Sequence, residues 1–439
     1  MNNHSDQTER FGYTQREYVI FRRYGWRFLL LFSFLYCSMY CVRLNLAAAS
    51  PVLMAQLGLT KGQLGLLTGV LFWTYGIGQL VNGRLSECVG PDRFILASAI
   101  GSICASVLMG LQSRFGPMAA IWAVNGYAQS MAWTSGVAII TRWWPGKMRG
   151  FASGFAYAFS GFGQALMTLS VTFALANFRS LGWRAAFIVP AAFPAFFLLL
   201  YVLFARTKPQ KVGLRAYAED NEDRRKSEEQ MRRIVESKGP LYPYRYLLSD
   251  RHYIPWLLVV FMAGVARYGL STWIPLFFVE KYGVDIINGL MQSLALPMGM
   301  GVGTLIVPSL TDRYCPDNRF AAVALSALVA GVAVILFVML DPRVLWQLVL
   351  IEALLFVSGF CIYAIGGTSV VYATDIGGRV FSGTAAGGLS FAAYMGAAIQ
   401  SVVYGLALKY LGWNFVFYSI SALCALSFII SAVDCRRGH

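Results

Sequence analysis

Twelve apolar segments alternate with short polar stretches along the chain. Each is long enough to cross a bilayer as a helix, which takes about 20 mostly apolar residues. A charged block at 206–252 separates six segments from six, so the pattern predicts an all-α membrane protein with twelve transmembrane helices in two pseudo-symmetric six-helix bundles. The expected bundles are 1–205 and 253–439, joined by a cytoplasmic linker. The expected spans are 26–49, 62–82, 94–112, 117–141, 151–176, 184–205, 253–279, 286–308, 320–340, 344–373, 383–405 and 413–433.

The composition supports a membrane protein, because 57% of the 439 residues are hydrophobic and 13% are charged. A soluble domain carries roughly a quarter charged residues. The net charge of +15 is distributed by loop: about 27 of the 36 Lys and Arg fall in the termini and in alternate loops. This asymmetry follows the positive-inside rule, so we expect a multi-pass protein of the cell inner membrane with both termini cytoplasmic and no nucleic-acid partner. No cleavable signal peptide is visible.

The eight cysteines show neither paired nor metal-ligand spacing, and most lie in or beside apolar segments, where Cys behaves as a small hydrophobe. The chain also shows no nucleophile–base pair. We therefore expect no metal, no cofactor and no enzymatic activity.

Two arginines, Arg43 and Arg267, lie inside the first apolar segment of each half. A charged side chain at mid-membrane costs roughly 2.5–3.5 kcal/mol, so it rarely occurs without a function. Tyr36 and Tyr40 share one helical face with Arg43. The alternatives are snorkelling from a span end, or pairing with Glu352, the acid that lies well inside a span and that would otherwise serve as a proton relay. We expect the two guanidiniums to face a shared cavity and hold an anion.

The two halves repeat short motifs at nearly one offset. Ser180-Leu-Gly-Trp183 precedes the sixth span and Tyr410-Leu-Gly-Trp413 the twelfth, and RGFASG at 149–154 corresponds to RVFSG at 379–383, 230 residues later. Arg43 and Arg267 are 224 apart. A two-fold repeat with a charged site between its copies is typical of an alternating-access carrier.

Two loops at matching places carry a glycine, acid and base pattern, GRLSECVGPDR at 83–93 and SLTDRYCPDNR at 309–319. The pattern resembles the inner gate of the major facilitator superfamily, although a tight charged turn would explain a single copy. An acid that faces a neighbouring helix end or arginine makes a breakable contact. The candidate gating residues are Glu87, Arg93, Asp312 and Arg319.

Within that superfamily the chain resembles the organophosphate:phosphate antiporters, which include glycerol-3-phosphate and hexose-6-phosphate carriers and related sensors. The resemblance covers nearly the whole length and rests on YCSMYCVRLN, YGIGQLVNGRLS, NGYAQSMAW, TRWWPGKMRG, KPQKVGL, RYGLSTWIP, CIYAIGG and SGTAAGGLSFAAYMG. It implies that Arg43 and Arg267 hold phosphate and that the cavity tyrosines are Tyr36, Tyr40, Tyr75, Tyr363 and Tyr394. The chain departs where family members have a lysine (Gln79 here), a histidine (Ser160 here) and a double proline after Trp133. Because of these matching positions, Gln79 and Ser160 are also expected to be substrate-binding residues.

The function implied by the resemblance is exchange of a phosphate ester, glycerol-3-phosphate or a sugar phosphate, for inorganic phosphate. Two guanidiniums match a dianion because each can form a two-pronged hydrogen bond. A sensor of the same fold, which binds hexose phosphate without transporting it and signals to a membrane kinase, is the alternative. A third possibility is a proton-driven carrier of a neutral solute, for which Arg43→Ala and Arg267→Ala variants would still work.

Overall fold

The computed structural model describes residues 13–144, 146–215, 226, 229–231, 233–234, 236–239, 242–314 and 319–437. Within these ranges several side chains, including those of Glu87 and Asp312, are not among the ones described. Over the described residues the chain is helical and contains no strand. The all-α fold expected from the apolar pattern is therefore confirmed.

The helices divide into two sets along the chain, here called the first half (residues 13–215) and the second half (residues 242–437). The first half contains α2 (Gln15–Met39), α3 (Asn45–Leu57), α4 (Lys61–Val89), α5 (Pro91–Leu111), α6 (Phe115–Trp143), α7 (Gly146–Asn177), α8 (Ala185–Ile188) and α9 (Ala192–Phe204), with 3-10 turns η1 (Tyr40–Val42), η2 (Arg179–Arg184) and η3 (Pro209–Val212). The second half contains α11 (Tyr242–Leu248), α12 (Tyr253–Tyr282), α13 (Ile286–Gln292), α14 (Ala295–Tyr314), α15 (Arg319–Val338), α16 (Leu345–Ala407) and α17 (Gly412–Arg437).

Eleven helical stretches in the described part of the chain are long and apolar enough to cross a membrane, and each coincides with an expected span. The remaining expected span, the fourth at 117–141, is the 29-residue helix α6. It is less apolar than the others because it carries polar side chains that are buried, Asn125, Gln129, Ser130 and Ser135. These residues face protein rather than lipid, which is where polar groups inside a membrane are found.

The long helix α16 holds two spans, 345–373 and 384–407. A straight helix of its 63 residues would be roughly three times as long as the bilayer core is thick. The part before residue 373 runs parallel to α14, with Phe356 beside Gly299 and Gly367 beside Pro308, and the second part packs on α12 and α4. Because α12 and α14 run in opposite directions, the chain reverses between the two spans.

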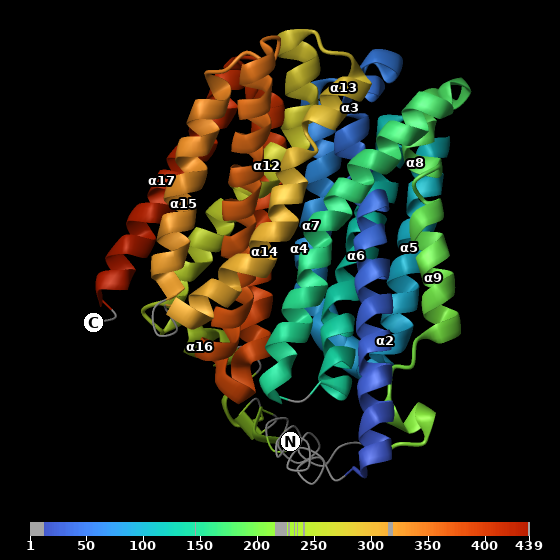
Figure 1. Cartoon of the computed structure of the whole chain (residues 1–439), viewed down its shortest axis with the longest axis vertical. Helices are drawn as coiled ribbons and strands as arrows, with labels where there is room; N and C mark the ends of the chain where they lie inside the picture. The colour runs from blue at the N-terminus through green and yellow to red at the C-terminus, as the bar shows by residue number, and fades with distance from the viewer. Residues whose placement is uncertain are drawn as a thin grey trace.

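The early and late helices stand side by side, with the first half on the right and the second half on the left of Figure 1. The halves meet chiefly where α4 packs on α16, α7 on α14 and α3 on α12, and smaller contacts join α7 with α13 and α16, and α3 with α13. We call the end where α3 meets α13 the α3 end, and the opposite end, near η3 and α11, the linker end. The boundaries at 205 and 252 stay a prediction.

The α3 end is tightly closed. A Cβ atom at Gly65 of α4 would overlap the carbonyl oxygen of Ser401, and Gly405 of α16 lies against the backbone of Lys61. At the other large contact between the halves, Gly161 of α7 faces the backbone of α14. Backbones approach this closely only where side chains are absent, as in small-residue contacts of membrane helices.

The gate residues proposed from the sequence lie at the linker end. Arg93 is exposed at the start of α5, Arg319 is half-buried at the start of α15, and the side chains of Glu87 and Asp312 fall outside the described set. Most of the mixed-charge run at 218–239, expected to be a solvated and partly helical tether, also lies outside the described residues.

An acid next to these positions, Asp92, makes contacts that the sequence did not indicate. Its carboxylate accepts hydrogen bonds from the Thr207 hydroxyl at 2.5 Å and the Lys211 ammonium at 3.1 Å. The Arg142 guanidinium lies 3.6 Å away. All four residues belong to the first half, so Asp92 ties the ends of α5 and α6 to the segment after α9 rather than joining the halves.

Candidate anion-binding site

The first span is broken at Arg43. Helix α2 ends at Met39, a 3-10 turn follows, and α3 begins at Asn45. Such a break exposes carbonyl groups that have no water to bind inside a membrane. Two amides of α6 satisfy them, because Gln129 Nε2 donates to Met39 O at 3.2 Å and Asn125 Nδ2 donates to Val42 O at 2.8 Å.

Arg43 points from this break into the protein and is only 1% exposed. Its Nε and Nη2 both donate to Gln129 Oε1, at 2.9 and 2.7 Å. The guanidinium lies over the rings of Tyr40, Tyr75 and Tyr36, at 4.3, 4.9 and 5.5 Å from their centroids. Its Nη1 is buried with no hydrogen-bond partner among the described residues. The neutral amide thus orients the cation and leaves one of its nitrogens available.

Arg267 projects from α12 of the other half. Its guanidinium lies over the rings of Tyr363 and Tyr268, at 4.1 and 4.5 Å from their centroids. Its Nη2 donates a long hydrogen bond of 3.5 Å to the Tyr40 hydroxyl, and its Nε is buried without a partner in the described part of the chain. As for Arg43, no described carboxylate pairs with it.

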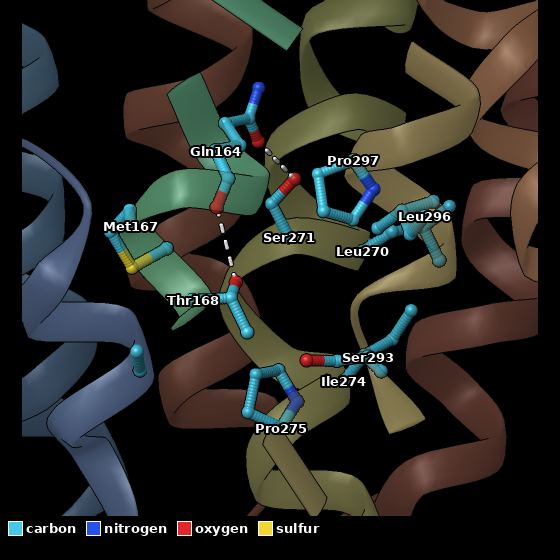
Figure 2. A pocket seen from close by; sticks show the side chains of 11 residues that line it. Gln164, Met167, Thr168, Leu270, Ser271, Ile274, Pro275, Ser293, Leu296 and Pro297 are labelled. Atoms are coloured by element: carbon cyan, nitrogen blue, oxygen red, sulfur yellow. Dashed lines mark hydrogen bonds between the residues drawn. The ribbon is translucent and has the colours of Figure 1, made fainter. Parts of the chain in front are cut away.

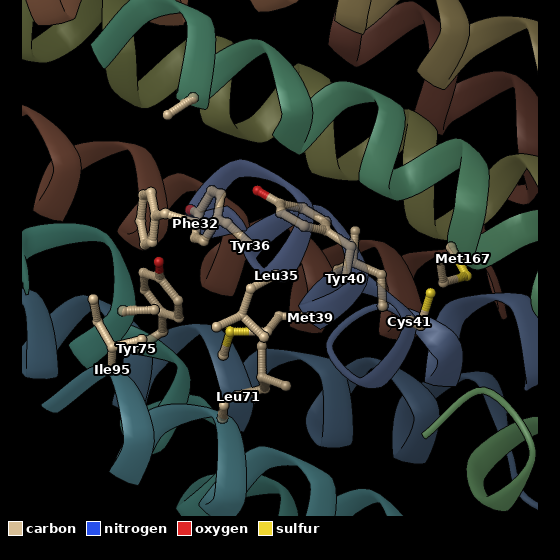
Figure 3. Packing of buried hydrophobic residues seen from close by; sticks show 14 of the residues in the cluster. Phe32, Leu35, Tyr36, Met39, Tyr40, Cys41, Leu71, Tyr75, Ile95 and Met167 are labelled. Atoms are coloured by element: carbon tan, nitrogen blue, oxygen red, sulfur yellow. The ribbon is translucent and has the colours of Figure 1, made fainter. Parts of the chain in front are cut away.

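Tyr40 connects the two arginines, because its ring packs under Arg43 while its hydroxyl accepts from Arg267. Figure 3 shows Tyr36 and Tyr40 on one segment, with Tyr75 on the neighbouring α4. The residues that the sequence places 224 positions apart therefore meet at one tyrosine. Glu352, the acid that was the alternative partner, is half-buried on α16 and pairs with none of the described cations.

The other expected site residues are tyrosines that pack across the two halves and two polar residues of α7 and α4. Tyr75 and Tyr394 pack with ring centroids 4.0 Å apart across the two halves. Ser160 of α7 forms a short hydrogen bond with the Tyr363 hydroxyl of α16, again across the halves. Gln79 is buried on α4, one turn beyond Tyr75 toward the linker end.

Several residues of the site were missed by the sequence reasoning. Tyr268 packs with Tyr394 and Phe72, and Tyr157 stacks on Tyr363 with centroids 5.3 Å apart. The most important omission is Gln129, which holds Arg43. Its signal was present: Asn125 and Gln129 stand four residues apart inside an expected span, and polar residues there usually have a task.

The arrangement is suited to a small dianion. Two guanidiniums with unpaired nitrogens are covered by tyrosine rings, and they contact the Tyr40 hydroxyl and the Gln129 amide. No described acid pairs with either of them. Guanidinium groups in a water-poor site make strong, directional hydrogen bonds to phosphate or carboxylate oxygens. The rings that cover them contribute cation–π attraction, which lowers the cost of holding the empty site.

The chain is similar to known membrane proteins over nearly its whole length. The family model of the Major Facilitator Superfamily matches residues 31–400. A probable hexose phosphate transport protein of Chlamydia trachomatis is 25% identical, over 92% of this chain and 90% of its own length. The glycerol-3-phosphate transporter of Bacillus subtilis is 26% identical over 92% of this chain and 90% of its own. The membrane sensor protein UhpC of Salmonella typhimurium is 23% identical over 93% and 91%.

The fold is also that of a solved transporter. The crystal structure of a D-xylose–proton symporter superposes with a TM-score of 0.71 at 14% identity, covering 93% of this chain and 97% of that one. At such identity the likeness concerns the fold alone. The phosphate-ester relatives confirm the resemblance to the organophosphate:phosphate antiporter group that the motifs indicated. This multi-pass membrane protein belongs to the major facilitator superfamily.

Proposed function

We propose that the chain is a secondary transporter that exchanges a phosphate ester for inorganic phosphate by alternating access. The observation that carries the proposal is the meeting of Arg43 and Arg267, one from each half, at Tyr40 without a described carboxylate. The relatives named as hexose phosphate and glycerol-3-phosphate transporters support a phosphate ester as the substrate class.

Exchange follows from the electrostatics of the empty site. Two like charges in a low dielectric repel each other, which opposes closing the halves around them. A bound phosphate group carries nearly two negative charges and removes this repulsion. The loaded protein then crosses between its two states more readily than the empty one, so each outward step with one anion is coupled to an inward step with another.

The orientation in the membrane is part of the proposal. The excess of Lys and Arg at the linker end supports a cytoplasmic position for that end and for both termini. The closed α3 end then faces outward. Glu87, Arg93, Asp312 and Arg319 at the linker end are proposed to gate the inner side.

The deciding experiment is exchange in proteoliposomes loaded with inorganic phosphate. We expect external glycerol-3-phosphate or glucose-6-phosphate to drive release of labelled phosphate, and no release without an external anion. A sensor, as the UhpC relative suggests, would bind the ester and release nothing. Release of similar size with a neutral sugar outside would contradict a phosphate-ester carrier.

Glu352 offers a test of proton coupling. If exchange is driven by the anions alone, a Glu352→Gln variant should keep phosphate exchange within about twofold at each pH between 6 and 8. If a pH gradient increases exchange in the unsubstituted protein and the Glu352→Gln variant has lost this increase, Glu352 acts as a proton relay instead. The measurement is labelled-phosphate release with and without the gradient.

A contact at the α3 end predicts how the outer side opens. Lys61 of α4 and Glu280 of α12 form an ion pair at 2.6 Å between the halves, and the Trp413 indole donates to the same carboxylate at 3.2 Å. A half-exposed pair contributes up to about 1 kcal/mol. Lys61→Ala should therefore raise the outward-open population up to about fivefold, as read from spin labels at Arg114 and Lys409.

The double variant Lys61→Ala/Glu280→Ala should match either single variant, because the first substitution already removes the interaction. Breaking the Asp341–Arg343 pair, which lies within one loop of the second half, is the matched control and should leave the label distance unchanged. Additive effects of the two single substitutions would show that Lys61 and Glu280 act independently.

A further inference from the structure

A small cavity lies between the halves, one helical turn from the arginine pair toward the α3 end. Ser271 follows Arg267 by four residues on α12, and Gln164 follows Ser160 by four on α7, so both are placed beside the site. Figure 2 shows Gln164, Thr168 and Ser271 around the cavity. The cavity therefore lies next to the proposed phosphate site, one turn further along both helices.

The cavity presents neutral polar groups. Gln164 Oε1 accepts a hydrogen bond of 3.1 Å from the Ser271 hydroxyl across the two halves. Gln164 is 2% exposed, and its Nε2 has no hydrogen-bond partner among the described residues. The hydroxyls of Thr168 and Ser293 donate to carbonyls of their own segments, which leaves their oxygens as acceptors. None of the lining residues is charged, and the remaining walls are apolar.

We infer that this cavity binds the uncharged, hydroxyl-bearing part of the phosphate ester, an inference that rests on the proposed function. A substrate hydroxyl would accept from Gln164 Nε2, which otherwise stays buried and unsatisfied. It would donate in turn to Thr168 or Ser293, while the apolar walls cover the carbon chain. A carboxylate here would lose its hydration without gaining a cation, so carboxylated esters are disfavoured.

The cavity as it stands is too small for the carbon chain of an ester and has to widen to admit one. The volume that the centre of a water molecule can occupy in this cavity is about 20 Å³. This is room for about one water. Because α7 and α12 belong to different halves, movement of the halves changes this volume. A three-carbon polyol then needs less widening than a hexose, and the site ranks glycerol-3-phosphate above glucose-6-phosphate and both above 3-phosphoglycerate.

The test separates this subsite from the phosphate site. Exchange of labelled phosphate for unlabelled phosphate does not use the cavity. Gln164→Leu and Ser271→Ala should therefore change the phosphate concentration that gives half-maximal exchange by less than twofold. Inhibition of the same exchange by glycerol-3-phosphate should weaken about tenfold in either variant, the effect of about one lost hydrogen bond. Ser421→Ala, which removes a buried hydroxyl that donates to Gly331 O away from the cavity, is the matched control and should change neither.

Each contrary outcome has a distinct meaning. Equal losses of phosphate exchange and ester inhibition would make the Gln164–Ser271 bond a structural link between the halves and overturn the subsite. Unchanged ester inhibition in both variants would also overturn it, and so would 3-phosphoglycerate inhibiting as well as glycerol-3-phosphate in the unsubstituted protein. No phosphate exchange at all in the unsubstituted protein would instead refute the proposed transport function.

Discussion

Arg43→Lys is expected to lower phosphate exchange at least 100-fold while the protein inserts and accumulates normally. The substitution keeps the charge but removes the planar set of three nitrogens. Arg43 uses Nε and Nη2 to donate to Gln129 and leaves Nη1 for a ligand. A lysine ammonium at this depth can serve Gln129 or the anion, but cannot hold both in fixed directions. Each lost hydrogen bond to a charged group is worth about 1.5–3 kcal/mol, so the loss of two of them lowers exchange by at least about 100-fold.

The same reasoning applies to Arg267→Lys, and the double variant should be little worse than either single one. Groups that act as one unit give non-additive losses, because removing the first already disables the site. Arg184→Lys is the matched control: Arg184 lies at the α3 end, donates to the Ser113 hydroxyl at 3.1 Å and packs on Trp183. Labelled-phosphate release from proteoliposomes and protein abundance are the readouts. Normal exchange by Arg43→Lys would make the arginine structural.

The fold was predictable from the sequence because the physical requirement behind it is simple. Spans must be long and apolar, and the excess of Arg and Lys in alternate loops gives a second, independent signal. The helix α6 shows the limit of that signal. Its buried amides at Asn125 and Gln129 lower its hydropathy, because a helix in the interior of the protein need not face lipid.

The break in the sixth span, between α8 and α9, lies at Pro190, but the other breaks inside spans were not predictable in the same way. The first span is interrupted beside Arg43, and the eighth at Ser293, between α13 and α14. Neither interruption has a proline at the break itself. What permits the first is a pair of amides about 85 residues further along the chain, which bind the freed carbonyls. Such long-range compensation leaves no local pattern to read.

For the site, sequence reasoning found the charges and missed what holds them. A buried arginine is conspicuous because it is costly, whereas tyrosines are common in this chain, which has 23. Tyr157 and Tyr268 could therefore not be distinguished from ordinary packing residues. Their positions became evident only where helices of the two halves meet. The functional roles of all these residues stay predictions until variants are measured.

The contact between Arg43 and Gln129 leads to a second large expected effect. Gln129→Glu would place a carboxylate where the amide oxygen now accepts from Arg43 at 2.7 and 2.9 Å. At about 4 Å and an effective dielectric constant of about 20, such a pair is worth about 4 kcal/mol. The arginine charge would be cancelled inside the protein, so phosphate exchange should fall at least 100-fold without loss of folding.

Gln129→Met is the matched control, because it also removes the hydrogen bond from Gln129 Nε2 to Met39 O but adds no charge. We expect it to lower exchange only about tenfold, since Arg43 loses its orienting acceptor and keeps its charge. Thermal unfolding with and without phosphate gives a second readout: the anion should stabilise the Met variant and leave the Glu variant unchanged. If both variants lose exchange equally, the amide is needed only to hold the broken first span, and its neutrality has no part in anion binding.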